Sequence, residues 1–92
     1  MKIKNITITG AAGNIAYALI FRILSNPPFK GIDKINLTLL DITPSIKSLT
    51  GLKYEIEDCA FETLNHISIT DNPELAFDES DYIIMVGAKP RT

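Results

Sequence analysis

Two glycines near the N-terminus form the pattern with the clearest chemical meaning in this sequence. Gly10 and Gly13 follow a segment rich in β-branched residues, and Ala16 comes three positions later in an apolar segment. Glycines lack the Cβ atoms that would hold a pyrophosphate away, so exposed N–H groups of the turn and the positive end of the next helix would face the anion. The spacing predicts a dinucleotide-binding turn, with a plain glycine-rich turn as the alternative. The residues expected to contact the cofactor are Gly10, Ala11, Ala12, Gly13, Asn14, Ile15 and Ala16.

An acidic residue stands where such a cofactor would make a second contact. Asp41 ends the second strand-like segment, and a carboxylate there accepts hydrogen bonds from the adenosine ribose and repels a 2′-phosphate. This predicts NAD rather than NADP. The spacing from the glycines exceeds the usual value of about 20 residues, because a long connection, 26–34, intervenes. The alternative, a cap for the next helix, is less favoured because Thr43 before Pro44 suits that role better.

The last residues of the chain offer two further candidates. Gly87 follows the fourth strand-like segment, where backbone can line a cofactor, and Arg91 carries a guanidinium group that suits a carboxylate. Judged by residue type alone, Arg91 is favoured as a solvated side chain near the end of the chain. No role is assigned to Lys89.

Other reactive side chains give weaker signals. We expect His66 on the surface, in a turn before a strand and without a paired acid, and Cys59 as a buried, inert thiol in mid-helix. The acidic residues between positions 55 and 62 fan around a helix, so no metal site is expected. No catalytic residue is predicted within this chain.

The elements that must position these residues alternate between strand and helix. Their order predicts an α/β fold of the Rossmann type, a doubly wound parallel sheet whose N-terminal half has the strand order 3-2-1-4. The expected strands are Ile3–Thr9, Ile35–Leu40, Ile67–Thr70 and Tyr82–Val86, and the expected helices are Asn14–Ser25, one from Thr43-Pro44 to about Leu64, and Pro73–Asp78.

The apolar patterning also predicts which elements are buried. The segment 14–25 is apolar almost all round and is expected to be buried on more than one side. The apolar stripe of 43–64 is wide enough for two contacts, and the continuous run 82–86 is typical of a strand buried on both faces.

Composition excludes several classes of protein. The 92 residues make at most one small domain, with a net charge of −2, which argues against nucleic acid as a partner. No apolar run is long enough to cross a membrane, and the single cysteine fits a reducing compartment.

Four segments together resemble the NAD-dependent malate dehydrogenases of the cytosolic type: Thr9–Tyr17, Leu39–Ile42, Tyr54–Phe61 and Val86–Arg91. The resemblance implies that residues 10–16 hold the pyrophosphate of NAD, that Asp41 binds the adenosine ribose, and that Arg91 binds a small dicarboxylate, malate or oxaloacetate. It further implies a cytoplasmic enzyme of the tricarboxylic acid cycle. In that family the wide-striped helix packs against a second subunit, which implies a homodimer.

The resemblance also implies that residues 1–92 are the N-terminal part of a dinucleotide-binding domain. The family's catalytic His–Asp pair and the substrate domain have no counterparts here, so we expect this chain alone to be inactive. Two other interpretations stay open. An extended short-chain dehydrogenase or epimerase would need a downstream Tyr-x-x-x-Lys and lacks the Gly-Ala-x-Pro-Arg run. A stand-alone nucleotide-binding module explains the short chain but not Arg91.

Overall fold

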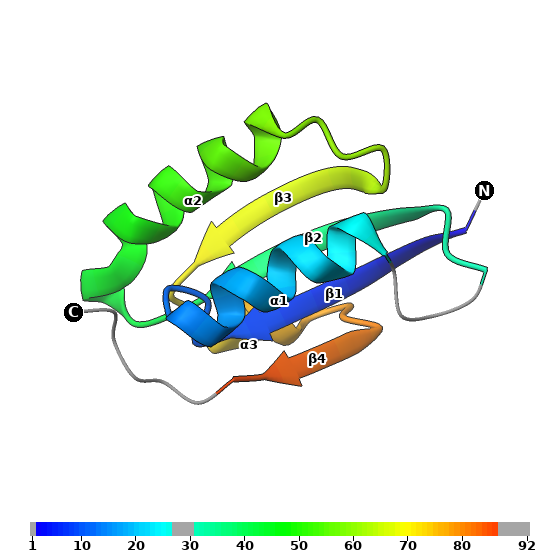
Figure 1. Ribbon diagram of the computed structural model, residues 1–92. Coiled ribbons are helices and arrows are strands. Elements are labelled where there is room, and N and C mark those ends of the chain that lie inside the picture. Colours follow the sequence, from blue (N-terminus) through cyan, green and yellow to red (C-terminus); the bar gives the residue numbers. More distant parts are fainter. Residues whose placement is uncertain (1, 27–30, 87–92) are drawn as a thin grey trace.

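A computed structural model describes residues 2–26 and 31–86 of the chain. Figure 1 shows a twisted sheet with helices packed on its faces. The sheet has four parallel strands in the order β3-β2-β1-β4, which confirms the predicted order. The strands are β1 (Ile3–Thr9), β2 (Lys34–Leu40), β3 (Leu64–Thr70) and β4 (Tyr82–Met85). The helices are α1 (Asn14–Ser25), the 3-10 turn η1 (Thr43–Ser45), α2 (Ile46–Asp58) and α3 (Pro73–Phe77).

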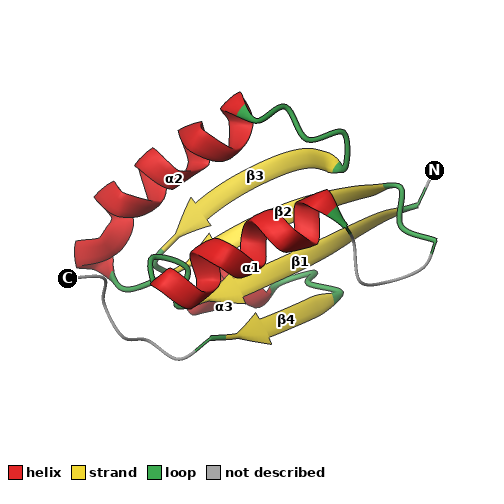
Figure 2. Ribbon diagram, viewed as in Figure 1, coloured by secondary structure: helices red, strands yellow, loops and turns green. Residues whose placement is uncertain are grey.

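The two long helices cover one face of the sheet and the short α3 lies on the other (Figure 2). Side chains alternate along a strand, so Ile6 and Ile8 of β1 point toward the long helices, whereas the Thr7 hydroxyl reaches α3 at the carbonyl of Ala76, 2.7 Å away. This arrangement follows from right-handed crossovers, because the chain reverses its direction across the sheet between β3 and β4.

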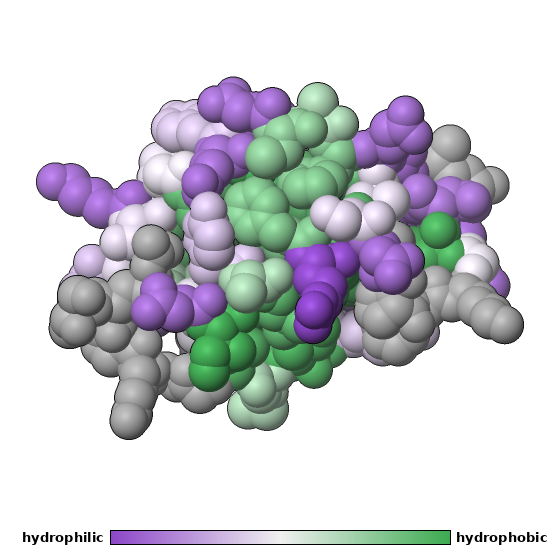
Figure 3. All heavy atoms as spheres, viewed as in Figure 1, coloured by the Kyte–Doolittle hydropathy of each residue, from purple (hydrophilic) through white to green (hydrophobic). Residues whose placement is uncertain are grey.

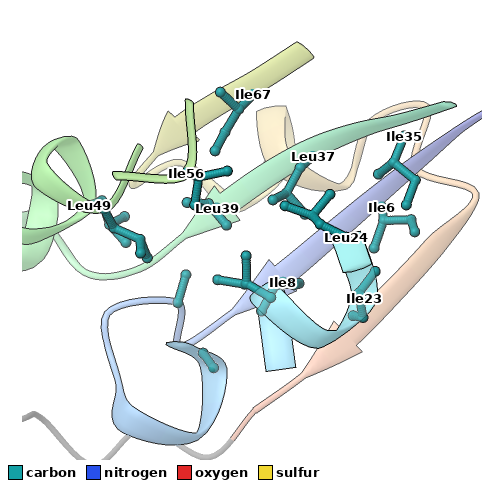
Figure 4. Packing of buried hydrophobic residues seen from close by; sticks show 14 residues of the cluster. Ile6, Ile8, Ile23, Leu24, Ile35, Leu37, Leu39, Leu49, Ile56 and Ile67 are labelled. Carbon is teal, nitrogen blue, oxygen red and sulfur yellow. The ribbon is translucent and has the colours of Figure 1, made fainter. Parts of the chain in front are cut away.

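The core lies between the long helices and the sheet. Residues of β1 and β2 on that face are fully or almost fully buried and meet Leu24 of α1 and Ile56 of α2 (Figure 4). Register sets this packing, because Ile6 pairs with Leu37 and brings apolar side chains into one layer. The same register places Thr9 beside Leu40, so β1 and β2 end together at one edge of the sheet.

The second helix is shorter than predicted. α2 ends at Asp58, and Ala60 adopts a left-handed conformation with φ 52° that stops the helix. The apolar residues within 59–64 therefore do not extend its stripe, and Cys59 is exposed rather than buried. β3 begins three residues earlier than predicted, because Leu64 already pairs with Ile35 of β2.

The prediction of burial on several sides is wrong for α1 and β4 in the described part of the chain. The Ile15 side chain of α1 is 71% exposed, and Met85 of β4 is 79% exposed. β4 is the outermost strand on its side, and Ile83 and Met85 face away from the long helices. Figure 3 shows a band of hydrophobic surface that runs down the viewed face over α1 toward β4.

Contrary to the prediction, Thr43 does not cap a helix. It is the first residue of η1, and Ile42 occupies the cap position without a side-chain hydrogen bond. The Thr43 hydroxyl donates instead to the carboxylate of Asp71, at 2.8 Å. No helix among the described residues is long and apolar enough to span a bilayer.

Candidate functional site

The glycine turn and the acidic residue meet at the carboxyl edge of the sheet. β1 ends at Thr9 and β2 at Leu40, which is its register partner. Gly10 and Asp41 follow directly, so two segments distant in sequence become neighbours. Crevices at this edge are where parallel α/β sheets bind ligands.

Backbone conformation explains why glycine is needed at position 10. Gly10 has φ 63°, in the left-handed region where a side chain is strained. The turn then closes with a hydrogen bond from the Gly13 N–H to the Gly10 carbonyl, at 3.1 Å. A second bond, from the Ala11 N–H to the Leu40 carbonyl at 3.2 Å, joins the turn to β2. The chain thereby reverses within four residues and starts α1 above the sheet edge.

The carboxylate of Asp41 is held by two backbone N–H groups. Its Oδ2 accepts the N–H of Ala12 at 2.9 Å, and its Oδ1 accepts the N–H of Ile42 at 2.7 Å. The residue is half-buried. A carboxylate has about four lone-pair positions, so both oxygens still have capacity to accept hydroxyl groups from a ribose. Sequence reasoning missed the bond to Ala12, which depends on the parallel register of β1 and β2.

The first turn of α1 supplies unpaired donors. The helical hydrogen-bond series begins at the Tyr17 N–H, which donates to the Gly13 carbonyl at 3.0 Å. The preceding N–H groups of Asn14, Ile15 and Ala16 have no acceptor inside the helix, as at any helix start. Gly13 provides no side-chain cap, and the first turn contains no acidic residue. These features make this helix end suited to an anion.

Which N–H groups are exposed differs from expectation. The N–H groups of Ala11, Ala12 and Gly13 donate hydrogen bonds within the turn or to the end of β2. The prediction that the N–H groups of the turn face an anion is therefore wrong for these three residues. Donors for an anion therefore lie only one or two residues further along, at Asn14 and Ile15, because the predicted contact at Ala16 is buried away from any ligand. Ala16 is fully buried and packs in the core, in keeping with the small residue that the pattern requires.

The remaining predicted residues are distributed as follows. The end of β4 reaches the end of β1, because the Val86 N–H donates to the Thr9 hydroxyl at 3.1 Å. Gly87 and Arg91 lie outside the described residues.

His66 is exposed, as predicted, but lies within β3 rather than in a turn. It precedes Thr70, the last residue of β3, by four positions, or ~13 Å along a strand. Within 2–26 and 31–86, no group of acidic, cysteine and histidine residues is placed to hold a metal ion.

A groove that the sequence did not predict opens between α1 and α2. It has a volume of about 470 Å³ and is lined by Ala12 and Tyr17 on one side and by Gly51 and Glu55 on the other, among other residues. The Tyr17 hydroxyl donates to Glu55 Oε1 at 2.8 Å and so bridges the two helices. Because Ala12 belongs to the glycine turn and lines the groove, the groove is continuous with that turn.

Comparison with known proteins narrows the interpretations of this site. Residues 4–92 match the family described as lactate/malate dehydrogenase, NAD binding domain. The chain belongs to this family. An extended short-chain dehydrogenase is thereby excluded, and the turn, Asp41 and the 3-2-1-4 sheet are parts of a family domain whose cofactor is NAD.

Individual lactate/malate dehydrogenase relatives support the same assignment. The chain is 43% identical to a malate dehydrogenase of Rubrobacter xylanophilus over 88 residues, which are 96% of this chain and 27% of that protein. It superposes on a malate dehydrogenase of Naegleria fowleri with a TM-score of 0.89 at 38% identity, covering 100% of this chain and 28% of the other. A lactate dehydrogenase of Trichomonas vaginalis, solved with NADH and oxamate, gives 0.84 at 39% identity, with 97% and 27% covered. The chain thus spans about a quarter of the length of these relatives.

The residues present fit the cofactor of the family. Unpaired N–H groups at the start of α1 suit a diphosphate, and the lone pairs left on Asp41 suit ribose hydroxyls. Both lie at adjacent strand ends, as one extended dinucleotide requires.

Proposed function

We propose that this chain binds NAD and that the whole protein is an NAD-dependent malate dehydrogenase of the cytosolic type. One observation carries the proposal: the unpaired N–H groups at the start of α1 and the Asp41 carboxylate lie at neighbouring strand ends. They do so in a chain that belongs to the lactate/malate dehydrogenase family. The named malate dehydrogenases among its relatives favour malate and oxaloacetate as substrates.

Each part of the site has a separate task in this proposal. The N–H groups of Asn14 and Ile15, two exposed residues, hold the diphosphate, and Asp41 accepts the hydroxyl groups of the adenosine ribose. Gly10 makes the turn that aims α1 at the anion. The bound nicotinamide supplies the hydride acceptor and donor chemistry. The chain itself binds and orients, because its only histidine, His66, lies far from the strand ends.

A titration tests cofactor binding by this chain. We expect calorimetry to detect NAD and ADP-ribose with similar affinities and NADP with a lower affinity, because the Asp41 carboxylate repels a 2′-phosphate. Equal binding of NAD and NADP would contradict the role of Asp41. The absence of binding by all three ligands would contradict cofactor binding itself.

Arg91 supports the choice of malate over lactate. A guanidinium fork pairs with a carboxylate through two parallel hydrogen bonds, and malate has a second carboxylate where lactate has a methyl group. In the whole protein we expect Arg91→Ala to raise the KM for oxaloacetate about 100-fold, in line with a lost charge-assisted interaction of about 3 kcal/mol. Lys89→Ala is the matched control, since it removes a neighbouring positive charge that has no assigned role. Equal KM values for the two variants would argue against this role for Arg91.

We further propose a cytoplasmic homodimer that acts in the tricarboxylic acid cycle. Aromatic side chains on the side of the long helices support the dimer. Tyr17, Phe21 and Phe61 form a row with ring centroids 4.9 and 5.9 Å apart, and Tyr54 of α2 is 62% exposed. Analytical ultracentrifugation tests the dimer, and Tyr54→Glu is expected to shift the whole protein toward monomer. A monomer before substitution would contradict the dimer, and fractionation of the source cells tests the location.

A further inference from the structure

We propose that Asp41 is a positioning residue for the anion-binding turn and not only a contact for ribose. By accepting the Ala12 N–H, its carboxylate fixes the turn in the shape that presents the first N–H groups of α1 to a diphosphate. The inference rests on the proposed NAD binding and assigns a second task to one residue of that site.

Two hydrogen bonds join the turn to the end of β2, and they differ in strength. The bond between the Ala11 N–H and the Leu40 carbonyl is 3.2 Å long, at the upper end of the usual range. The bond between the Ala12 N–H and Asp41 Oδ2 is 2.9 Å long and has an ionised acceptor, which roughly doubles the strength of a hydrogen bond. The carboxylate is therefore the stronger of the two attachments.

The carboxylate is itself held before any ligand binds. The Ile42 N–H donates to Oδ1 at 2.7 Å, so the carboxylate group bridges the turn after β1 and the turn after β2. Each oxygen accepts one backbone N–H and retains capacity for a hydroxyl group. Positioning the turn and binding ribose are thus compatible tasks for the same side chain.

The start of α1 depends on this attachment. Gly13 occupies the cap position, so no side-chain hydrogen bond caps the first turn of the helix. Ala12 precedes Gly13 directly, and its position sets where the helix begins. Release of Ala12 is expected to let the donors of Asn14 and Ile15 move away from a common anion.

Inorganic pyrophosphate distinguishes this task from a ribose contact, because it contains no ribose. Asp41→Asn and Asp41→Ala both remove one negative charge near the anion, which by itself strengthens pyrophosphate binding. Only asparagine retains an oxygen that can accept the Ala12 N–H. We therefore expect Asp41→Ala to bind pyrophosphate about tenfold more weakly than Asp41→Asn, as measured by NMR titration of the 92-residue chain.

Amide hydrogen exchange supplies the second measurement. We expect faster exchange of the Ala12 and Ala11 N–H groups in Asp41→Ala, although the Leu40 carbonyl is unchanged, and intermediate rates in Asp41→Asn. Asp71→Ala is the matched control, because Asp71 directly follows β3 at the same edge and bonds Thr43 rather than the turn. It is expected to leave these exchange rates unchanged.

The outcomes separate the two levels of the account. Equal pyrophosphate affinities and equal exchange rates in the alanine and asparagine variants would overturn the positioning role while leaving NAD binding intact. If the unmodified chain binds neither pyrophosphate nor NAD, the proposed function fails, and the exchange rates alone decide whether Asp41 fixes the turn.

Discussion

Replacement of Asn14 by proline removes one proposed diphosphate donor with little effect on the fold. Asn14 is the first residue of α1, its side chain is exposed, and its N–H has no acceptor inside the helix. Proline is favoured at this position because the missing N–H is unpaired there in any case. The preceding residue, Gly13, has φ −83° and ψ 165°, the extended conformation that a residue before proline adopts.

The expected loss follows from the type of bond removed. A hydrogen bond to a charged group contributes about 1.5–3 kcal/mol, so Asn14→Pro should weaken ADP-ribose binding by about 10- to 100-fold. Asn14→Ala, which keeps the N–H, is the matched control and should bind as the unmodified chain does. Thermal unfolding should show Asn14→Pro to be at least as stable as the control.

Calorimetric titration with ADP-ribose and with adenosine measures this effect. Adenosine has no phosphate, so its affinity should be the same in both variants. Equal affinities of the proline and alanine variants for ADP-ribose would refute the assignment of the Asn14 N–H as a diphosphate donor.

Four further predictions concern stability and activity. Gly10→Ala should lower the free energy of unfolding by about 1–2 kcal/mol, because φ at position 10 is 63°. By contrast, Gly51→Ala in α2 should raise it by roughly 0.5–1 kcal/mol, because an added Cβ meets no atom within 4 Å; chemical denaturation measures both. Thr7→Val should cost about 1 kcal/mol through the lost bond to the Ala76 carbonyl, and an unchanged unfolding midpoint would contradict it. The purified chain should not oxidise NADH with oxaloacetate, because His66 lies too far from the strand ends to exchange a proton there; measurable turnover would refute this.

Much of the fold could be predicted from the sequence because its signals are local. The β-branched segment 3–9 and the break at Gly10 define the first strand and turn, and the predicted bounds of β1 and α1 agree with the structure. The alternation of strands and helices predicted a parallel sheet with right-handed crossovers, and the strand order followed from the doubly wound fold that this alternation indicates. The first glycine of the pattern was identified by spacing, and its positive φ supplies the physical reason.

The end of α2 could not be predicted, because its stop signal is absent from the sequence. Ala60 ends the helix in a left-handed conformation that glycine or asparagine normally adopts. The one-sided burial of α1 and β4 was also unpredictable, because apolar composition indicates which surfaces favour burial and not which element covers them. Ile15 and Met85 illustrate this difference.

The bond between Asp41 and Ala12 belongs to a different class of unpredictable feature. It depends on the register in which Thr9 pairs with Leu40, a contact between segments about 30 residues apart. Once that register is known, position 41 must lie beside the turn, and the carboxylate finds a backbone donor. Sequence reasoning located the residue, but the attachment required three-dimensional structure.

Amide chemical shifts during a titration of the 92-residue chain with ADP-ribose test the central claim most directly. The account predicts that the largest changes occur at the N–H groups of Asn14 and Ile15, with a second group at Asp41 and Ile42. Saturable changes confined to other surfaces, such as the groove at Gly51, or no changes at all, would contradict a dinucleotide site at these strand ends.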